Sequence, residues 1–213
     1  FLADARSMPI DSDSIDFILT SPPYINVFNY HQNYRRSAEM LNWDLLHVAK
    51  SEIGSNRANR GNRFLTVIQY CLDMACVVKE MRRVCRDDAQ VILVVGYESN
   101  VLGVPFYNAD ILEALACESG LFDVHLRQKR EFKNKFGNII REDLLHLKPS
   151  LGTSNSDRVS SVARAVANRA LLKGIPTVAE KNKRFLKDAV EQVDNIESTP
   201  VFSNSIHNAR ILS

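Results

Sequence analysis

The chain has 213 residues, a formal net charge of +2, 45% hydrophobic residues and 24% charged residues. These values are ordinary for a soluble globular domain with an appended element, and so small a charge does not by itself demand a nucleic-acid partner. No apolar run approaches the roughly 20 residues of a membrane span, and no signal peptide opens the chain. The four cysteines form no C-x-x-C pair. We therefore expect a cytoplasmic protein without a membrane partner, a metal site or disulfides.

The first half of the chain predicts two strands with a long helix between them. Ile15 to Leu19 form an apolar run typical of a strand buried on both faces. Residues 37 to 46 predict a helix, and residues 50 to 63 an exposed basic loop. From Thr66 to about residue 86, apolar residues recur at spacings of three or four. Val91 to Val95 then predict a second fully buried strand.

The second half predicts a helix, a hairpin and two more helices. Asp110 to Ser119 form the helix, which begins in a capping-box spacing. Phe122 to Lys133 and Arg141 to Lys148 alternate as two strands of a hairpin. Residues 157 to 173 and 177 to 194 predict the last helices, the second opened by another capping box. This order of elements indicates an α/β domain with an open sheet.

Directly after the first predicted strand stands Thr20-Ser21-Pro22-Pro23-Tyr24, here called the elbow. Open α/β sheets bind ligands at the carboxyl ends of their strands. The two prolines lack N–H groups and restrict the residues before them, so we expect the elbow carbonyls to face outward instead of joining a ladder. A rigid row of acceptors beside an aromatic ring suits a flat group that carries an amino substituent.

The elbow resembles the catalytic motif of the S-adenosylmethionine-dependent DNA amino-methyltransferases, which methylate cytosine N4 or adenine N6. Ala3-Asp4-Ala5-Arg6 is similar to an upstream element of that family, apart from a missing glycine. The first strand's lead-in, the "VILVVG" strand and the final hairpin are similar as well. The resemblance implies a partial Rossmann-like methyltransferase sheet with a C-terminal β-hairpin over residues 1–149. Residues 150–213 are then a helical extension.

The resemblance also implies a role for each matching residue. A DNA base is flipped out of the duplex, and Ser21 and Pro22, with Pro23 stiffening the segment, accept hydrogen bonds from its exocyclic amine. Tyr24 stacks on the base. The cofactor S-adenosylmethionine contacts Asp4, Ala5 and Thr20, with Asp4 bonded to its adenine. Serine at the first motif position favours cytosine N4, although a cytosine and an adenine amine are chemically similar and adenine N6 stays open. The expected context is a restriction-modification system.

The family's glycine-rich cofactor loop has no counterpart in this chain. Its eight glycines, at positions 54, 61, 96, 103, 120, 137, 152 and 174, include no G-x-G spacing. Because the sequence starts at Phe1, within what reads as a domain, we expect the loop to lie upstream or on a second chain. The chain alone should then bind the cofactor poorly. Two alternatives remain: an RNA amino-methyltransferase, or a non-catalytic remnant or subunit that binds DNA or a partner.

Two groups of basic residues are candidates for contacts with double-stranded DNA. Arg57, Arg60 and Arg63 interleave with asparagines in the basic loop, a combination suited to phosphates and base edges. Lys129 and Arg130 lie on the predicted hairpin. If both groups touch phosphate, binding should weaken steeply with salt.

Overall fold

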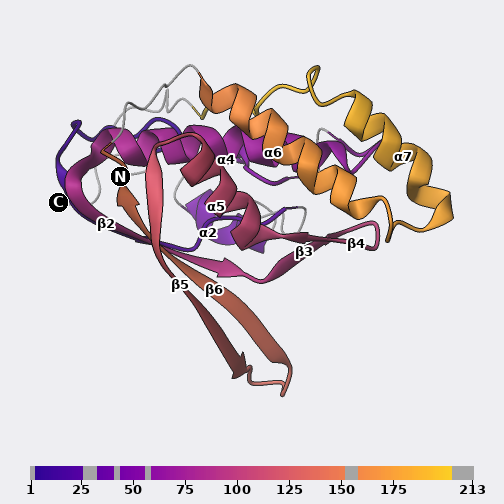
Figure 1. Cartoon of the computed structure of the whole chain (residues 1–213), viewed down its shortest axis with the longest axis horizontal. Helices are drawn as coiled ribbons and strands as arrows, with labels where there is room; N and C mark the ends of the chain where they lie inside the picture. Colours follow the sequence, from indigo (N-terminus) through magenta and orange to yellow (C-terminus); the bar gives the residue numbers. More distant parts are fainter. Residues whose placement is uncertain (1–2, 26–32, 41–43, 56–58, 152–157, 203–213) are drawn as a thin grey trace.

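The computed structural model describes residues 3–25, 33–40, 44–55, 59–151 and 158–202 (Figure 1). Arg57, one of the predicted DNA contacts, lies outside these ranges. None of the described helices has both the length and the apolar character needed to cross a membrane.

A four-stranded sheet forms the centre of the α/β fold. The order of its strands is β1 (Ile15–Thr20), β2 (Cys85–Gly96), β6 (Ile139–Pro149) and β5 (Phe122–Lys133). β1 and β2 are parallel and joined through helix α4 (Leu65–Val84), the βαβ unit of Rossmann-like sheets, whereas β6 is antiparallel to both β2 and β5. The predicted α/β class and the C-terminal hairpin are thus confirmed.

The other elements are short strands and helices. A two-stranded sheet, which the sequence reading missed, follows β2 and consists of β3 (Glu98–Val101) and β4 (Val104–Tyr107). The single helix predicted over residues 37–46 is replaced by two short ones. The remaining helices are α2 (Arg35–Met40), α3 (Leu45–Ser51), α5 (Asn108–Glu118), α6 (Val159–Gly174) and α7 (Glu180–Glu191).

One face of the sheet forms the core with the helices. Val91, Leu93 and Val95 of β2 are buried, together with Leu145 and Leu147 of β6, and belong to the same cluster as the apolar residues of α4 and α5. α6 packs on α4 and α5, as Figure 1 shows, and its buried apolar face joins this cluster. The sequence boundary at residue 150 stays a prediction, since the helix that follows it shares the core.

The prediction that both parallel strands are buried on both faces is wrong. Phe17 and Leu19 of β1 are 52% and 62% exposed, because β1 lies at the edge of the described sheet with a neighbour on one side only. In β2 the residues at odd positions from Ala89 to Val95 are buried, and the alternate residues are half-buried or exposed.

Both predicted capping boxes are also wrong. Helix α5 begins after Tyr107, and Asp110 and Glu113 instead bind Arg127 on β5. Before α7, the Thr177 hydroxyl donates to the carbonyl of Gly174 at the end of α6. These polar groups therefore connect separate elements, which local spacing in a sequence does not reveal.

Candidate functional site

The elbow leaves the sheet at the carboxyl end of β1. Thr20, the last residue of β1, pairs with Leu93, and β2 continues three residues further to Gly96. Pro22 is buried, whereas Ser21 is exposed, and none of the residues that the structure describes hydrogen-bonds the Ser21 hydroxyl group. Thr20 is exposed as well, so the elbow presents two residues with hydroxyl side chains to solvent on an anchored backbone.

Two neighbours hold the backbone of the elbow. The Tyr70 hydroxyl on α4 donates to the carbonyl oxygen of Pro23 at 3.0 Å, so this carbonyl does not face outward as predicted. Gly54, after α3, has a φ of +77° and lies so close to the elbow that a Cβ atom there would be 2.5 Å from the carbonyl oxygen of Tyr24. Only glycine combines this backbone conformation with so close an approach.

The ring of Tyr24 reaches from the elbow across to the end of β2. A Cβ atom on Gly96 would lie 3.0 Å from Tyr24 Cζ, so glycine is the residue that lets the ring approach the strand. The Gly96 carbonyl accepts from the amide of the fully buried Asn108 at 3.0 Å, and Asn108 in turn accepts from Ser99 at 2.9 Å. Sequence reasoning had assigned Gly96 only to the end of a strand and missed Asn108.

Asp4, predicted to bind the cofactor's adenine, is buried and engaged within the protein. Its carboxylate accepts from Arg6 Nε at 2.9 Å and Nη2 at 2.6 Å, and from the backbone N–H of Phe202 at 2.7 Å. Burial alone would raise the pKa of Asp4, but the hydrogen bonds from Arg6 and Phe202 outweigh it and lower the pKa. A cofactor contact of Asp4 stays a prediction.

Arg6 lies between two buried carboxylates. Besides Asp4, its Nη1 atom donates to Asp73 on α4 at 2.8 Å, and Nη2 donates to the carbonyls of Ser51 and Pro200 at 3.0 Å. Asp73 also accepts from the backbone N–H of Thr199 at 2.8 Å and from its hydroxyl at 3.0 Å. This cluster therefore joins both ends of the described chain to α4.

Burial raises the pKa of Asp73 to about 6, against the lowering effect of Arg6 and Thr199. A raised pKa in the folded state means that Asp73 favours folding below about pH 4 and loses this contribution as the pH rises through 6. Asp73→Asn keeps one acceptor oxygen for Arg6 and removes the titration. Between pH 4 and 7 we expect the free energy of unfolding of wild type to fall by about 2 kcal/mol relative to Asp73→Asn. Urea unfolding at several pH values measures this difference, and parallel pH profiles would contradict it.

An apolar cavity of about 430 Å³ lies along β1 and ends at the elbow. The predicted cofactor residues Ala5 and Thr20 line it. None of the charged side chains in the described ranges lines it, although S-adenosylmethionine carries a carboxylate, an ammonium and a sulfonium group. The described residues therefore do not fit the whole cofactor. The lining consists of Ala5, Met8, Ile10, Ile15, Phe17, Ile18, Leu19, Thr20, Ser21, Pro22, Pro23, Ile53, Met74, Val77, Met81 and Val84.

Arg60 and Arg63 of the basic loop lie at the same end of the sheet as the elbow. Both arginines precede α4. The last residues of α4, Arg83 and Val84, accept backbone hydrogen bonds from residues 13 and 14, just before β1. Since α4 ends beside the start of β1, it begins near the carboxyl end of β1, where the elbow lies. Arg60 is exposed and Arg63 half-buried. Of the asparagines expected to reach base edges, Asn59 donates to Gln69, and Asn62 donates to α7.

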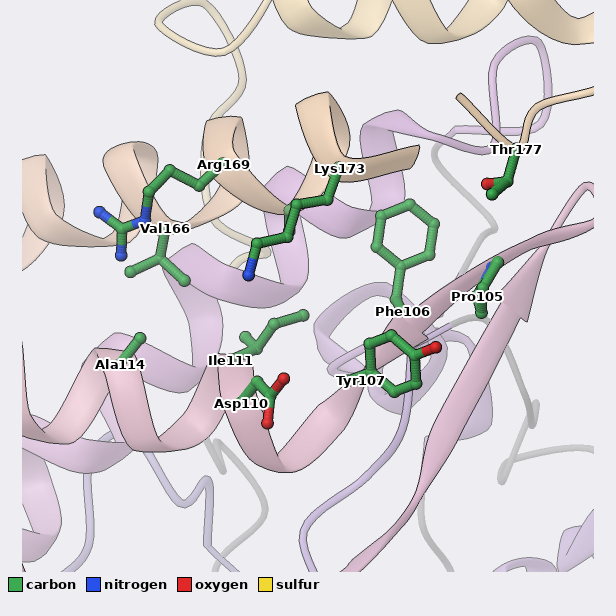
Figure 2. Close-up of a pocket in the computed structure, with 11 residues that line it drawn as sticks. Pro105, Phe106, Tyr107, Asp110, Ile111, Ala114, Val166, Arg169, Lys173 and Thr177 are labelled. Atoms are coloured by element: carbon green, nitrogen blue, oxygen red, sulfur yellow. The ribbon is translucent and has the colours of Figure 1, made fainter. Parts of the chain in front are cut away.

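On the hairpin, Lys129 is exposed and Arg130 forms an ion pair with Glu142. A small cavity of about 180 Å³ lies elsewhere, between α5, α6 and β4. Figure 2 shows Lys173 of α6 pointing into it above Ile111 and Asp110 of α5. The structure thus places this cavity apart from the elbow, in the contact between α6 and the core.

No protein-family model matches the chain, and no curated protein matches it. Among solved structures it is similar to a SAM-dependent methyltransferase from Methanosarcina mazei, with a TM-score of 0.40 and 12% identity over 70% of this chain and 66% of that one. It is also similar to a putative hemolysin from Streptococcus thermophilus, with a TM-score of 0.27 and 19% identity over 47% of this chain and 40% of that one. The chain spans less than two thirds of either structure.

Proposed function

We propose that this chain carries the base-binding part of a nucleic-acid amino-methyltransferase, which transfers a methyl group from S-adenosylmethionine to an exocyclic amine. The observation that carries the proposal is the anchored elbow, which leaves the Ser21 hydroxyl exposed at the carboxyl end of β1. Ligands of open α/β sheets bind outside the carboxyl ends of the strands. The sequence resemblance favours DNA and cytosine N4 within a restriction-modification system.

In this proposal the elbow binds and orients the amine. The Ser21 hydroxyl and the Pro22 carbonyl accept its N–H hydrogens, which turns the nitrogen lone pair toward the methyl donor. The proton that the amine loses on transfer would pass along the hydrogen bond to Ser21 and on to water. Tyr24, supported by Gly96, stacks on the base. The cofactor supplies a methyl group on a cationic sulfur. The contribution of this chain is thus mainly orientation and electrostatic support.

The donor is then held mostly by a second segment, in an upstream sequence or on another chain, that carries the glycine-rich loop. The exposed Phe17 and Leu19 on β1, together with the apolar cavity beside them, support this partner. A parallel strand added to the free edge would cover both side chains and fill apolar space. The described residues that line the cavity would not by themselves supply the charged groups that the cofactor needs.

We therefore expect no micromolar binding of S-adenosylmethionine to the isolated chain. Calorimetric titration of the chain with the cofactor measures this directly. Titration in the presence of a segment that carries the loop should restore binding, because the polar contacts then come from that segment. Micromolar affinity of the chain by itself would refute the division of the site.

Methylation assays test the function itself. The chain with its donor-binding segment is incubated with duplex DNA, with RNA and with isotopically labelled cofactor, and the nucleosides are analysed by mass spectrometry. N4-methylcytosine in DNA is the expected product, whereas N6-methyladenine in DNA would change the base. Label only in RNA would favour the RNA enzyme. Binding of DNA without any label would favour the non-catalytic subunit, which the missing loop supports.

A further inference from the structure

The outer part of the β5–β6 hairpin projects from the body of the molecule (Figure 1). β2 pairs with β6 only as far as Gly96 and Glu142, whereas β5 and β6 continue to pair out to Lys133 and Ile139. Residues 129–142 are called the ribbon here. Because Gly96 is the carboxyl end of β2, the ribbon leaves the sheet at the same end as the elbow.

The tip of the ribbon is built to present one aromatic side chain. Asn134 Oδ1 accepts from the backbone N–H groups of Phe136 at 2.9 Å and Asn138 at 3.0 Å, and Gly137 turns the chain with a φ of +81°. Phe136 is 75% exposed. Since the turn is already ordered, a partner that covers this ring costs little further backbone entropy.

The ribbon carries a net positive charge. Residues 129–142 contain five cationic and two acidic residues, a net charge of +3. The two carboxylates, Glu131 and Glu142, form ion pairs with Arg141 and Arg130. Within the described part of the chain, no acidic group pairs with Lys133 or Lys135 at the tip, although Lys135 lies 5.0 Å from the centre of the Phe136 ring.

We infer that the ribbon binds duplex DNA, with Lys133 and Lys135 on phosphates and Phe136 inserted against the base stack beside the flipped base. A two-stranded ribbon fits a DNA groove, and apolar side chains act as wedges between base steps. Flipping costs a few kcal/mol of unstacking, which a stacked aromatic ring partly offsets. The inference rests on the proposed function for its substrate, and the shared end of the sheet brings the ribbon and the elbow to one duplex.

Fluorescence anisotropy of a labelled 30-base-pair duplex, titrated with the full chain at several salt concentrations, tests the inference. Lys133→Gln with Lys135→Gln should lower the slope of log affinity against log salt by about 2, because two phosphate contacts are lost. The matched control is Lys181→Gln with Lys187→Gln on α7, which removes the same charge from another exposed surface and should leave the slope unchanged.

Phe136→Ala should weaken binding about tenfold at fixed salt and leave the slope unchanged, since the lost contact is apolar. Phe185→Ala on α7, also an exposed phenylalanine, is its control. Equal behaviour of ribbon and control variants, or no duplex binding by wild type, overturns the inference. Methyl transfer that persists unchanged in the ribbon variants would support the proposed function and refute the inferred contact between the ribbon and DNA. Ribbon-dependent DNA binding without methyl transfer would instead support the contact and refute the proposed function.

Discussion

Ser21→Ala should lower the rate of base methylation by at least about a hundredfold, the size of effect found when one positioned polar contact is removed from a reacting group. Ser21 is an exposed residue of the elbow, and its hydroxyl would orient the amine in the proposed mechanism. Because Ser21 is exposed, we expect the free energy of unfolding to change by less than about 0.5 kcal/mol. Labelled methyl transfer and urea unfolding measure the two quantities, with the donor-binding segment present in the first.

Ser160→Ala is the matched control, since Ser160 is an exposed serine on α6. A pair of substitutions at Tyr24 then separates stacking from hydrogen bonding. Tyr24→Phe should keep most of the activity because the ring remains, and Tyr24→Ala should lose it. Full activity of Ser21→Ala or Tyr24→Ala would refute the assignment of the site.

Arg6→Met should destabilise the fold by about 3–5 kcal/mol, because it leaves two buried carboxylates without their cation. The side chains of Asp4 and Asp73 are 5% and 0% exposed, and Arg6 bonds both. With a total stability of about 5–15 kcal/mol for a typical protein, this loss is large. Urea unfolding at pH 7 measures it, and a fold that fails to form is the extreme of the same result.

Arg35→Met is the control for this prediction. Arg35 and Glu39 are largely exposed neighbours on α2, and such surface pairs contribute less than about 1 kcal/mol. Combining Arg6→Met with Asp73→Asn should recover part of the stability, since one of the two unpaired charges is then absent. A stability of Arg6→Met within about 1 kcal/mol of wild type would contradict the role given to the cluster.

The cluster and the elbow are connected through α4. Tyr70, which holds the Pro23 carbonyl, and Asp73, which binds Arg6, lie three positions apart on this helix, so both project from the same side. The bond between Arg6 and Asp73 therefore also holds α4 in place, and α4 carries Tyr70, which binds the elbow. Asp4 and Arg6, which resemble a cofactor element in the sequence, have at least this structural role.

Much of the fold followed from patterns of short range. The apolar run at Ile15 to Leu19, the period of α4 and the alternation of β5 and β6 each predicted an element that the structure contains. The ends of helices were less predictable, since Asp110, Glu113 and Thr177 make tertiary contacts in place of caps. The short strands β3 and β4 have too few residues for a periodic signal.

The sequence by itself determined the order of the elements and the elbow at the end of a strand, because hydrophobic period and proline geometry act between near neighbours. Only the tertiary structure decided that β1 lies at a sheet edge, that Gly54 and Gly96 make room for the elbow and its ring, and that Asp4 is bonded to Arg6. These features depend on segments far apart in the chain meeting in space. Strand pairing, close approach of backbones and burial of charged groups arise only where such segments pack together and exclude water.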